Sequence, residues 1–290
     1  MQGRGIELRA LDLAGPQEPI VAALKNVDIL ISAIGPSDQL AQIPLATAAK
    51  AAGVKLFLPC AFVTVMPAGV HMLRDQKEEV YNHIKRLALP FTVVDVGWWY
   101  QIAFPNLASG KIDYAIGVPS ANRIPGDGEQ VSGLTDLRDI GRYVARIIQD
   151  ERTLNKYVFV YNELWAPNSV YSALERISGE EIPREYSNAR ELEARIRDAD
   201  EKLAKGTDPG ANFPLFIQKV SAQYQRSFAI RGDNTPAYAK FLGYLTSKEL
   251  YPDMSYIKFE DYLQEVVEGK AKPVYDEMKA MFDQMRKAKT

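Results

Sequence analysis

Residues 27–62 read VDILISAIGPSDQLAQIPLATAAKAAGVKLFLPCAF, and they carry the clearest indication of the fold in the chain. The run VDILISAI is almost continuously apolar, as expected of a parallel strand that is buried on both faces. The alanine-rich run 40–53 predicts a helix, because it ends at Gly53, a typical C-terminal cap. VKLFLPC then returns to strand, so the stretch predicts a βαβ unit.

The two loops of this unit are the first candidates for chemistry. Ligands of parallel sheets bind outside the carboxyl ends of the strands. Those ends fall at residues 33–37 and 59–62. We therefore expect a binding crevice between these loops.

The flanking sequence extends the same pattern. Apolar runs predict further strands at 5–13, 90–96 and 156–162, and periodic runs predict helices at 19–27, 74–87 and 135–150. Either Thr135 or Asp136 can cap the last of these helices. The turn-rich segment 109–131 favours short antiparallel strands and a surface loop.

The second half of the chain predicts mainly helices, including 187–205 and 272–287. The fold class is therefore α/β: a Rossmann-type parallel sheet with helices on both faces, plus a smaller, mostly helical substrate domain. We expect the nucleotide-binding domain at 1–165, with an excursion at about 104–133, and the substrate domain at 166–290.

Composition excludes several classes of protein. A formal net charge of −2 over 290 residues argues against a nucleic-acid surface. The single cysteine, Cys60, excludes an internal disulfide framework, and two histidines leave little for a metal site. No apolar run approaches the roughly 20 residues of a membrane span, and no secretory signal opens the chain. A cytoplasmic location is the expectation.

The usual phosphate-binding motif of dinucleotide folds does not occur in this sequence. That motif is a strand, then G-x-G-x-x-G, then a helix whose N-terminus holds the pyrophosphate. Gly3 and Gly5 lie at the start of the first predicted strand, with no strand ahead of them and no helix directly behind. Two expectations stay open: the glycine-rich unit was lost, or the protein does not bind a dinucleotide in the usual way. An uncovered apolar edge at 5–13 would favour poor solubility or self-association, such as a homodimer.

Five segments together resemble the isoflavone reductase-like branch of the NmrA-like proteins, which are atypical short-chain dehydrogenase relatives. The order and spacing of the segments match as well as their residue types, and the resemblance covers about 5–179. The segments are GIELRALDL (5–13), ALKNVDILISAIG (23–35), QIPLATAAKAAGVKLFLPCAF (42–62), LPFTVVDVGWWY (89–100) and IPGDGEQVSGLTDLRDIGRYVARIIQDERTLNKYVFV (124–160).

The resemblance implies an NADP(H)-dependent reductase with an active-site lysine on the helix before the PFTVV strand. Lys77 lies 13 positions before Pro90, the separation found in that family. A lysine there can hold or relay a proton to a substrate oxygen, and partial burial lowers its pKa. The alternative is a solvated helix lysine, paired with Glu78 or Asp75.

Residues 81–85, YNHIK, also match the Y-x-x-x-K dyad of ordinary short-chain dehydrogenases. Helical spacing puts Tyr81 and Lys85 on one face. Lys85 lies only five positions before Pro90, near the end of the helix away from the crevice. We interpret this match as coincidence.

The resemblance also assigns a cofactor crevice. It puts Asp12 and Leu13 beside the adenine, and a loop with a close-approach glycine beside the ribose and phosphates. For the apolar members, core packing is the alternative role. The implied cofactor-binding residues are Asp12, Leu13, Ala33, Ile34, Gly35, Gln42, Pro59, Cys60, Phe62 and Gly97.

An aromatic cluster at the carboxyl end of the PFTVV strand predicts a substrate pocket. Its members are Trp98, Trp99 and Tyr100, and the nearby His71 is a candidate for assisting proton transfer or for an ordinary loop position. The loop PCAFV (59–63) departs from the family's P-S-E-F-G. Cys60 is then either a weak hydrogen-bond donor or an inert buried thiol.

Two functions follow as hypotheses. The first is an NADP(H)-dependent reductase of a small aromatic or polyketide-like metabolite, with Lys77 as the proton relay. The second is a non-catalytic, NmrA-type regulator that binds a dinucleotide and a protein partner, or a truncated form without activity. The altered loop 59–63 favours the second, and Lys77 with the aromatic cluster favours the first.

Overall fold

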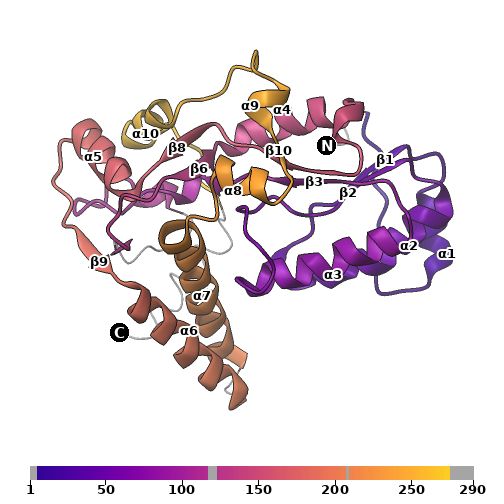
Figure 1. The fold of residues 1–290 in the computed structure, drawn as a ribbon, viewed down its shortest axis with the longest axis horizontal. Coiled ribbons are helices and arrows are strands. Elements are labelled where there is room, and N and C mark those ends of the chain that lie inside the picture. The colour runs from indigo at the N-terminus through magenta and orange to yellow at the C-terminus, as the bar shows by residue number, and fades with distance from the viewer. Residues whose placement is uncertain (1–4, 117–122, 207–208, 275–290) are drawn as a thin grey trace.

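The computed structural model describes residues 5–116, 123–206 and 209–274 (Figure 1). Ten α-helices are assigned within these ranges: α1 (Gln17–Ala23), α2 (Gln42–Ala52), α3 (Met72–Arg86), α4 (Leu137–Ile147), α5 (Pro167–Ser178), α6 (Ala189–Ala204), α7 (Pro209–Gln225), α8 (Pro236–Phe241), α9 (Ser247–Leu250) and α10 (Phe259–Val267). The strands are β1 (Ile29–Ile31), β2 (Leu56–Leu58), β3 (Thr92–Asp95), β4 (Trp98–Trp99), β5 (Arg123–Pro125), β6 (Ser132–Thr135), β7 (Lys156–Phe159), β8 (Glu163–Trp165), β9 (Glu185–Ser187) and β10 (Leu245–Thr246).

The strands predicted at 27–34, 54–60, 90–96 and 156–162 form a parallel sheet, which confirms the α/β fold. β1 pairs with β2, and β3 pairs with β7, which also pairs with β10. A parallel bridge between Phe57 and Phe91 joins the two groups. The spatial order is therefore β1-β2-β3-β7-β10, with every pairing parallel.

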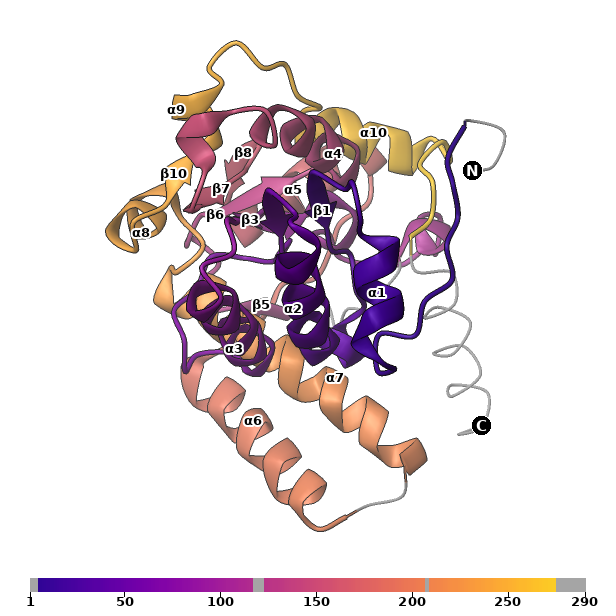
Figure 2. The same ribbon diagram turned by 90° about the vertical axis from the view of Figure 1, so that its right-hand side faces the viewer.

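Helices cover both faces of this sheet. Neighbouring strand residues point to opposite sides, and because the residues on both sides are apolar, both faces have to be buried. Phe57 and Val93 pack in one cluster with side chains of α1, α2 and α3, whereas Leu58 and Val94 pack in another with α4. Figure 2 shows α1, α2 and α3 side by side on one face. Gly53, at φ +80°, caps α2 as predicted, and Asp136 is the residue that caps α4.

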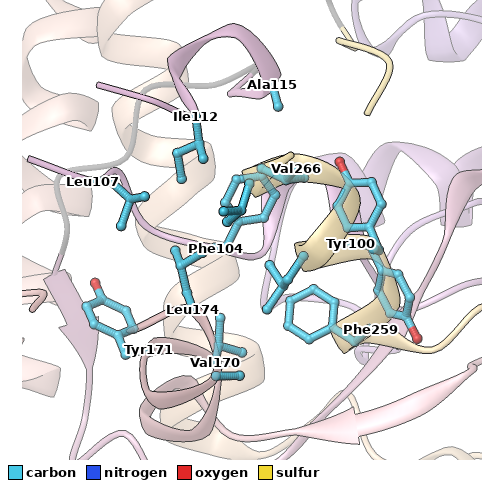
Figure 3. Close-up of a cluster of buried hydrophobic side chains, with 14 of the residues drawn as sticks. Tyr100, Phe104, Leu107, Ile112, Ala115, Val170, Tyr171, Leu174, Phe259 and Val266 are labelled. Carbon is cyan, nitrogen blue, oxygen red and sulfur yellow. The ribbon is translucent and has the colours of Figure 1, made fainter. Parts of the chain in front are cut away.

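A second core lies beyond the sheet, where β4, β6 and β8 form a mixed sheet under α5 and α10. Tyr100, Phe104, Leu174 and Phe259 meet there (Figure 3). The helices α6 and α7 pack against each other and extend away from the body of the molecule (Figure 1). The division into domains at residue 165 stays a prediction, and β10 shows that the second half also contributes a strand to the parallel sheet.

Two expectations about strands are wrong. Residues 5–13 make no strand pairing, and Ile6 and Leu8 are exposed, because strand propensity yields a strand only where an edge is paired. In 109–131, the described residues hold only one strand, β5, and it pairs in parallel with β9 rather than antiparallel. Residues 117–122, and most of the helix predicted at 272–287, lie outside the described residues.

Candidate functional site

Lys77 is a buried cation at the carboxyl ends of β1 and β2. It lies on α3 and is only 3% exposed. Its Nζ donates hydrogen bonds to Gln39 Oε1 (2.9 Å) and to the Cys60 carbonyl oxygen (2.5 Å). Its neighbours on the helix have other partners: Glu78 pairs with Arg74 and Asp75 accepts from the Gly69 N–H. The solvated alternative is therefore wrong.

The environment of Lys77 lowers its pKa. Burial is the largest cause, since a charged group loses solvation there. Cys60 and Asp95 act in the opposite direction, and Arg74, one turn earlier on α3, lowers the pKa further. A lysine with a depressed pKa can exchange a proton near neutral pH more readily than an exposed one.

The two predicted loops meet through side-chain hydrogen bonds. Cys60 Sγ donates to the Ile34 carbonyl oxygen at 3.2 Å, and the Cys60 N–H donates to Gln42 Oε1 at 2.6 Å. Gln39 Nε2 donates to the Gly35 carbonyl oxygen at 2.8 Å. Cys60, Ile34, Gly35 and Gln42 are therefore joined to Lys77 in one hydrogen-bond network through Gln39 and the Cys60 carbonyl oxygen, and their role in binding a cofactor stays a prediction.

Gln39 is the member of this network that the sequence did not reveal. It lies in a 3-10 turn, Pro36–Ala41, before α2 and is 3% exposed. Its neighbours in sequence carry no motif, and the nearest signal is its position three residues before Gln42, which it contacts. Only the packing of α3 against this turn brings it to Lys77.

Two residues of the crevice have a left-handed backbone. Phe62 has φ +48°, which is uncommon for a bulky residue, and its N–H donates to the Val94 carbonyl oxygen. Gly97 has φ +69°, and a Cβ there would lie 2.3 Å from the Gly133 carbonyl oxygen. Gly97 is therefore fixed by close packing against Gly133, whatever else it contacts.

The remaining cofactor candidates differ in exposure. Asp12, Ala33 and Gly35 are exposed, whereas Pro59 is buried and Leu13 packs against the cluster under α1. Asp12 Oδ1 accepts a hydrogen bond from the Ala14 N–H, which holds the turn after the extended segment. Their assignment to the cofactor crevice stays a prediction.

The residues of the predicted aromatic pocket do not gather in one place. His71 and Trp98 both contact Tyr224 of α7, with ring centroids 4.0 Å and 5.0 Å apart, and Trp98 also contacts Phe228 at 5.2 Å. Trp99 instead packs with the cluster under α4. Tyr100 is buried in the second core, where its hydroxyl donates to Glu163 and to the Ile257 carbonyl oxygen. No motif in the sequence pointed to Tyr224 or Phe228.

The Y-x-x-x-K match does not form a dyad. Tyr81 is 1% exposed and packs in the cluster between α2 and α3. Lys85 lies over the ring of Tyr157, 5.4 Å from its centroid.

Within the described residues, no group of histidine, cysteine and carboxylate side chains could hold a metal ion. Among the same residues, none of the helices combines the length and the apolar character of a membrane span.

Comparison with known proteins gives one consistent result. The profile of the NmrA-like family matches residues 1–263. The chain is 43% identical to asnovolin J 5′,6′-dehydrogenase of Aspergillus novofumigatus (strain IBT 16806), over 93% of this chain and 82% of that protein. It is 28% identical to a phenylcoumaran benzylic ether reductase of Betula pendula, over 92% and 83%.

Solved structures show the same fold. An isoflavone reductase matches with a TM-score of 0.71 at 23% identity, covering 91% of this chain and 82% of that one. Leucoanthocyanidin reductase of Vitis vinifera, solved as a complex with NADPH, matches with a TM-score of 0.70 at 24% identity, covering 87% and 79%.

Proposed function

The chain belongs to the NmrA-like family, and from that membership and its site we propose that it is an NADP(H)-dependent reductase of a small aromatic or polyketide-like metabolite. The observation that carries the proposal is the buried Lys77 ammonium between the two loops. An ammonium has three N–H donors. Within the described part of the chain two of them meet Gln39 and Cys60, which leaves one for a substrate oxygen.

The residues at the sheet edge fit a dinucleotide. Ala33 and Gly35 are exposed, and nothing lies within 4 Å of the Cβ position of Gly35, so a ribose or phosphate can approach the backbone closely. Asp12 and Leu13 would then hold the adenine side, and Phe62 the nicotinamide side. A bound nicotinamide supplies the hydride.

Lys77 has the proton-transfer role in this proposal. Its Nζ gives a proton to the substrate oxygen that gains charge as the neighbouring carbon accepts hydride, and the neutral amine then regains a proton from solvent. Trp98, Tyr224 and Phe228 supply an apolar, aromatic face for the rest of the substrate.

The test compares two lysines of the same helix. Lys77→Met removes the ammonium but keeps the length of the side chain, and we expect turnover to fall by at least about 10²-fold. NADPH affinity, followed by fluorescence titration, should change little, since Lys77 acts on the substrate. Lys85→Met on α3 is the matched control and should keep wild-type turnover.

Isoflavone, pinoresinol and asnovolin J serve as probe substrates, because relatives are named for such compounds. The melting temperature of each variant shows that it folds. Unchanged turnover by a folded Lys77→Met enzyme would remove Lys77 from the mechanism.

A second function has one observation in its favour. Tyr224 and Phe228 pack directly on Trp98, where a substrate would lie. A regulator that binds a dinucleotide and a protein partner does not require that face to open. Tight NADPH binding without turnover of any probe substrate would favour this regulator.

A further inference from the structure

We propose that Gln39 is a positioning residue, whose side-chain amide orients the Lys77 ammonium and connects it to the loop that follows β1. This inference rests on the proposed function, because it concerns the lysine that transfers the proton there. Gln39 lies in the turn before α2, and no sequence motif marks it. The orientation of its side-chain amide is the observation that supports the proposal.

The orientation of the Gln39 amide is fixed from its nitrogen side. Nε2 donates to the carbonyl oxygens of Gly35 (2.8 Å) and Ile34 (3.3 Å). Carbonyl oxygens only accept hydrogen bonds, so the nitrogen has to face the loop and the oxygen has to face Lys77. Gln42 Nε2 supports this arrangement by donating to Gln39 Oε1 at 3.3 Å.

The amide oxygen opposes the effect of burial on Lys77. An acceptor 2.9 Å from Nζ stabilises the ammonium, which burial destabilises. The charged or titratable groups that face Lys77 come from several elements: Cys60 after β2, Asp95 on β3, Arg74 on α3, and His71 at the start of α3. Gln39 is the neutral side chain that contacts Nζ directly.

Two variants separate positioning from simple support of the loop. Gln39→Met and Gln39→Glu both remove the Nε2 donors to Gly35 and Ile34, so both lose the hydrogen bonds that support the loop. They differ at the atom that faces Lys77. Methionine leaves the ammonium without this acceptor, whereas glutamate puts a negative charge beside it.

The pKa of Lys77 is measured directly in the full chain, from the Cε–Nζ correlation in ¹³C,¹⁵N NMR, assigned with Lys77→Met. We expect this pKa to fall by about one in Gln39→Met and to rise in Gln39→Glu. The alkaline limb of the turnover profile should move in the same directions by about one pH unit. Gln149→Met, at an exposed glutamine after α4, is the control and should change neither.

Opposite shifts in the two Gln39 variants support the inference. Shifts in the same direction, or no shift in folded variants, would overturn it. The NMR titration is independent of activity, so it distinguishes the two proposals. If Lys77→Met keeps its turnover, the proposed proton transfer fails, while the effect of Gln39 on the pKa of Lys77 is still measured.

Discussion

At the scale of single residues, backbone conformation accounts for two positions of the crevice. Phe62 holds a left-handed conformation that costs about 1–3 kcal/mol in a bulky residue, at the loop whose carbonyl group accepts from Lys77. Gly97 has no room for a side chain, because β4 follows directly and brings the backbone against Gly133. Such strain collects at binding sites, where the surrounding fold enforces it.

Gly97→Ala is therefore expected to destabilise the protein by at least about 2 kcal/mol, from both the positive φ and the contact with Gly133. Gly141→Ala is the matched control, because Gly141 lies on α4 with nothing within 4 Å of its Cβ position. That change should stabilise the protein by up to about 1 kcal/mol. Urea unfolding measures both. Equal effects would contradict this account of Gly97.

At the scale of elements, α3 organises the site. His71 caps its N-terminus, since Nδ1 accepts from the Leu73 N–H at 3.0 Å. The helical spacing of Arg74, Lys77 and Tyr81 puts all three on the buried face. Arg74 pairs with Asp95 of β3 at 2.8 Å. This buried ion pair joins α3, the helix that carries Lys77, to the sheet.

The cap of α3 also makes stability depend on pH. Burial, the largest cause, together with the nearby cations Arg226 and Lys219 lowers the pKa of His71 from an ordinary value of 6.5 to about 3. Below pH 6.5 the unfolded chain binds a proton that the native imidazole does not. The stabilisation is therefore complete above pH 6.5 and is lost as the pH falls toward 3.

His71→Asn tests this, because asparagine caps a helix without titrating. Between about pH 7 and about pH 5, the wild type should lose about 2 kcal/mol more unfolding free energy than this variant. His83→Asn, at a half-buried histidine, should keep most of the wild-type slope. Parallel pH profiles for the wild type and His71→Asn would show that His71 is not the titrating group.

At the scale of the whole molecule, the segment before α8 joins the parts of the fold. Asn234 is fully buried; its Oδ1 accepts from the Val65 N–H, and its Nδ2 donates to Ser132 Oγ and to the Gly133 carbonyl oxygen. Tyr244, farther along, donates to Asp95 at 2.6 Å. Through Asn234 and Tyr244, the second half of the chain forms hydrogen bonds with the loop after β2, with strand β3 and with the second sheet.

Asn234→Ala should lower the free energy of unfolding by about 3 kcal/mol, since it leaves buried polar groups without partners. Asn82→Ala, on the exposed side of α3, should change it by no more than about 0.5 kcal/mol. Urea denaturation of the full chain gives both values. A loss below 1 kcal/mol for Asn234→Ala would show that these bonds are replaced by water.

Apolar periodicity and helix caps are local signals, so they predicted four strands of the parallel sheet and its first helices, whereas the assignment of Lys77 to the site came from the family resemblance. These local signals failed at residues 5–13, where a strand pattern has no strand to pair with. The contacts of Gln39 with Lys77 and of Tyr224 with Trp98 are seen only in the folded molecule. Those contacts join elements distant in the chain, and packing sets them, which no local pattern encodes.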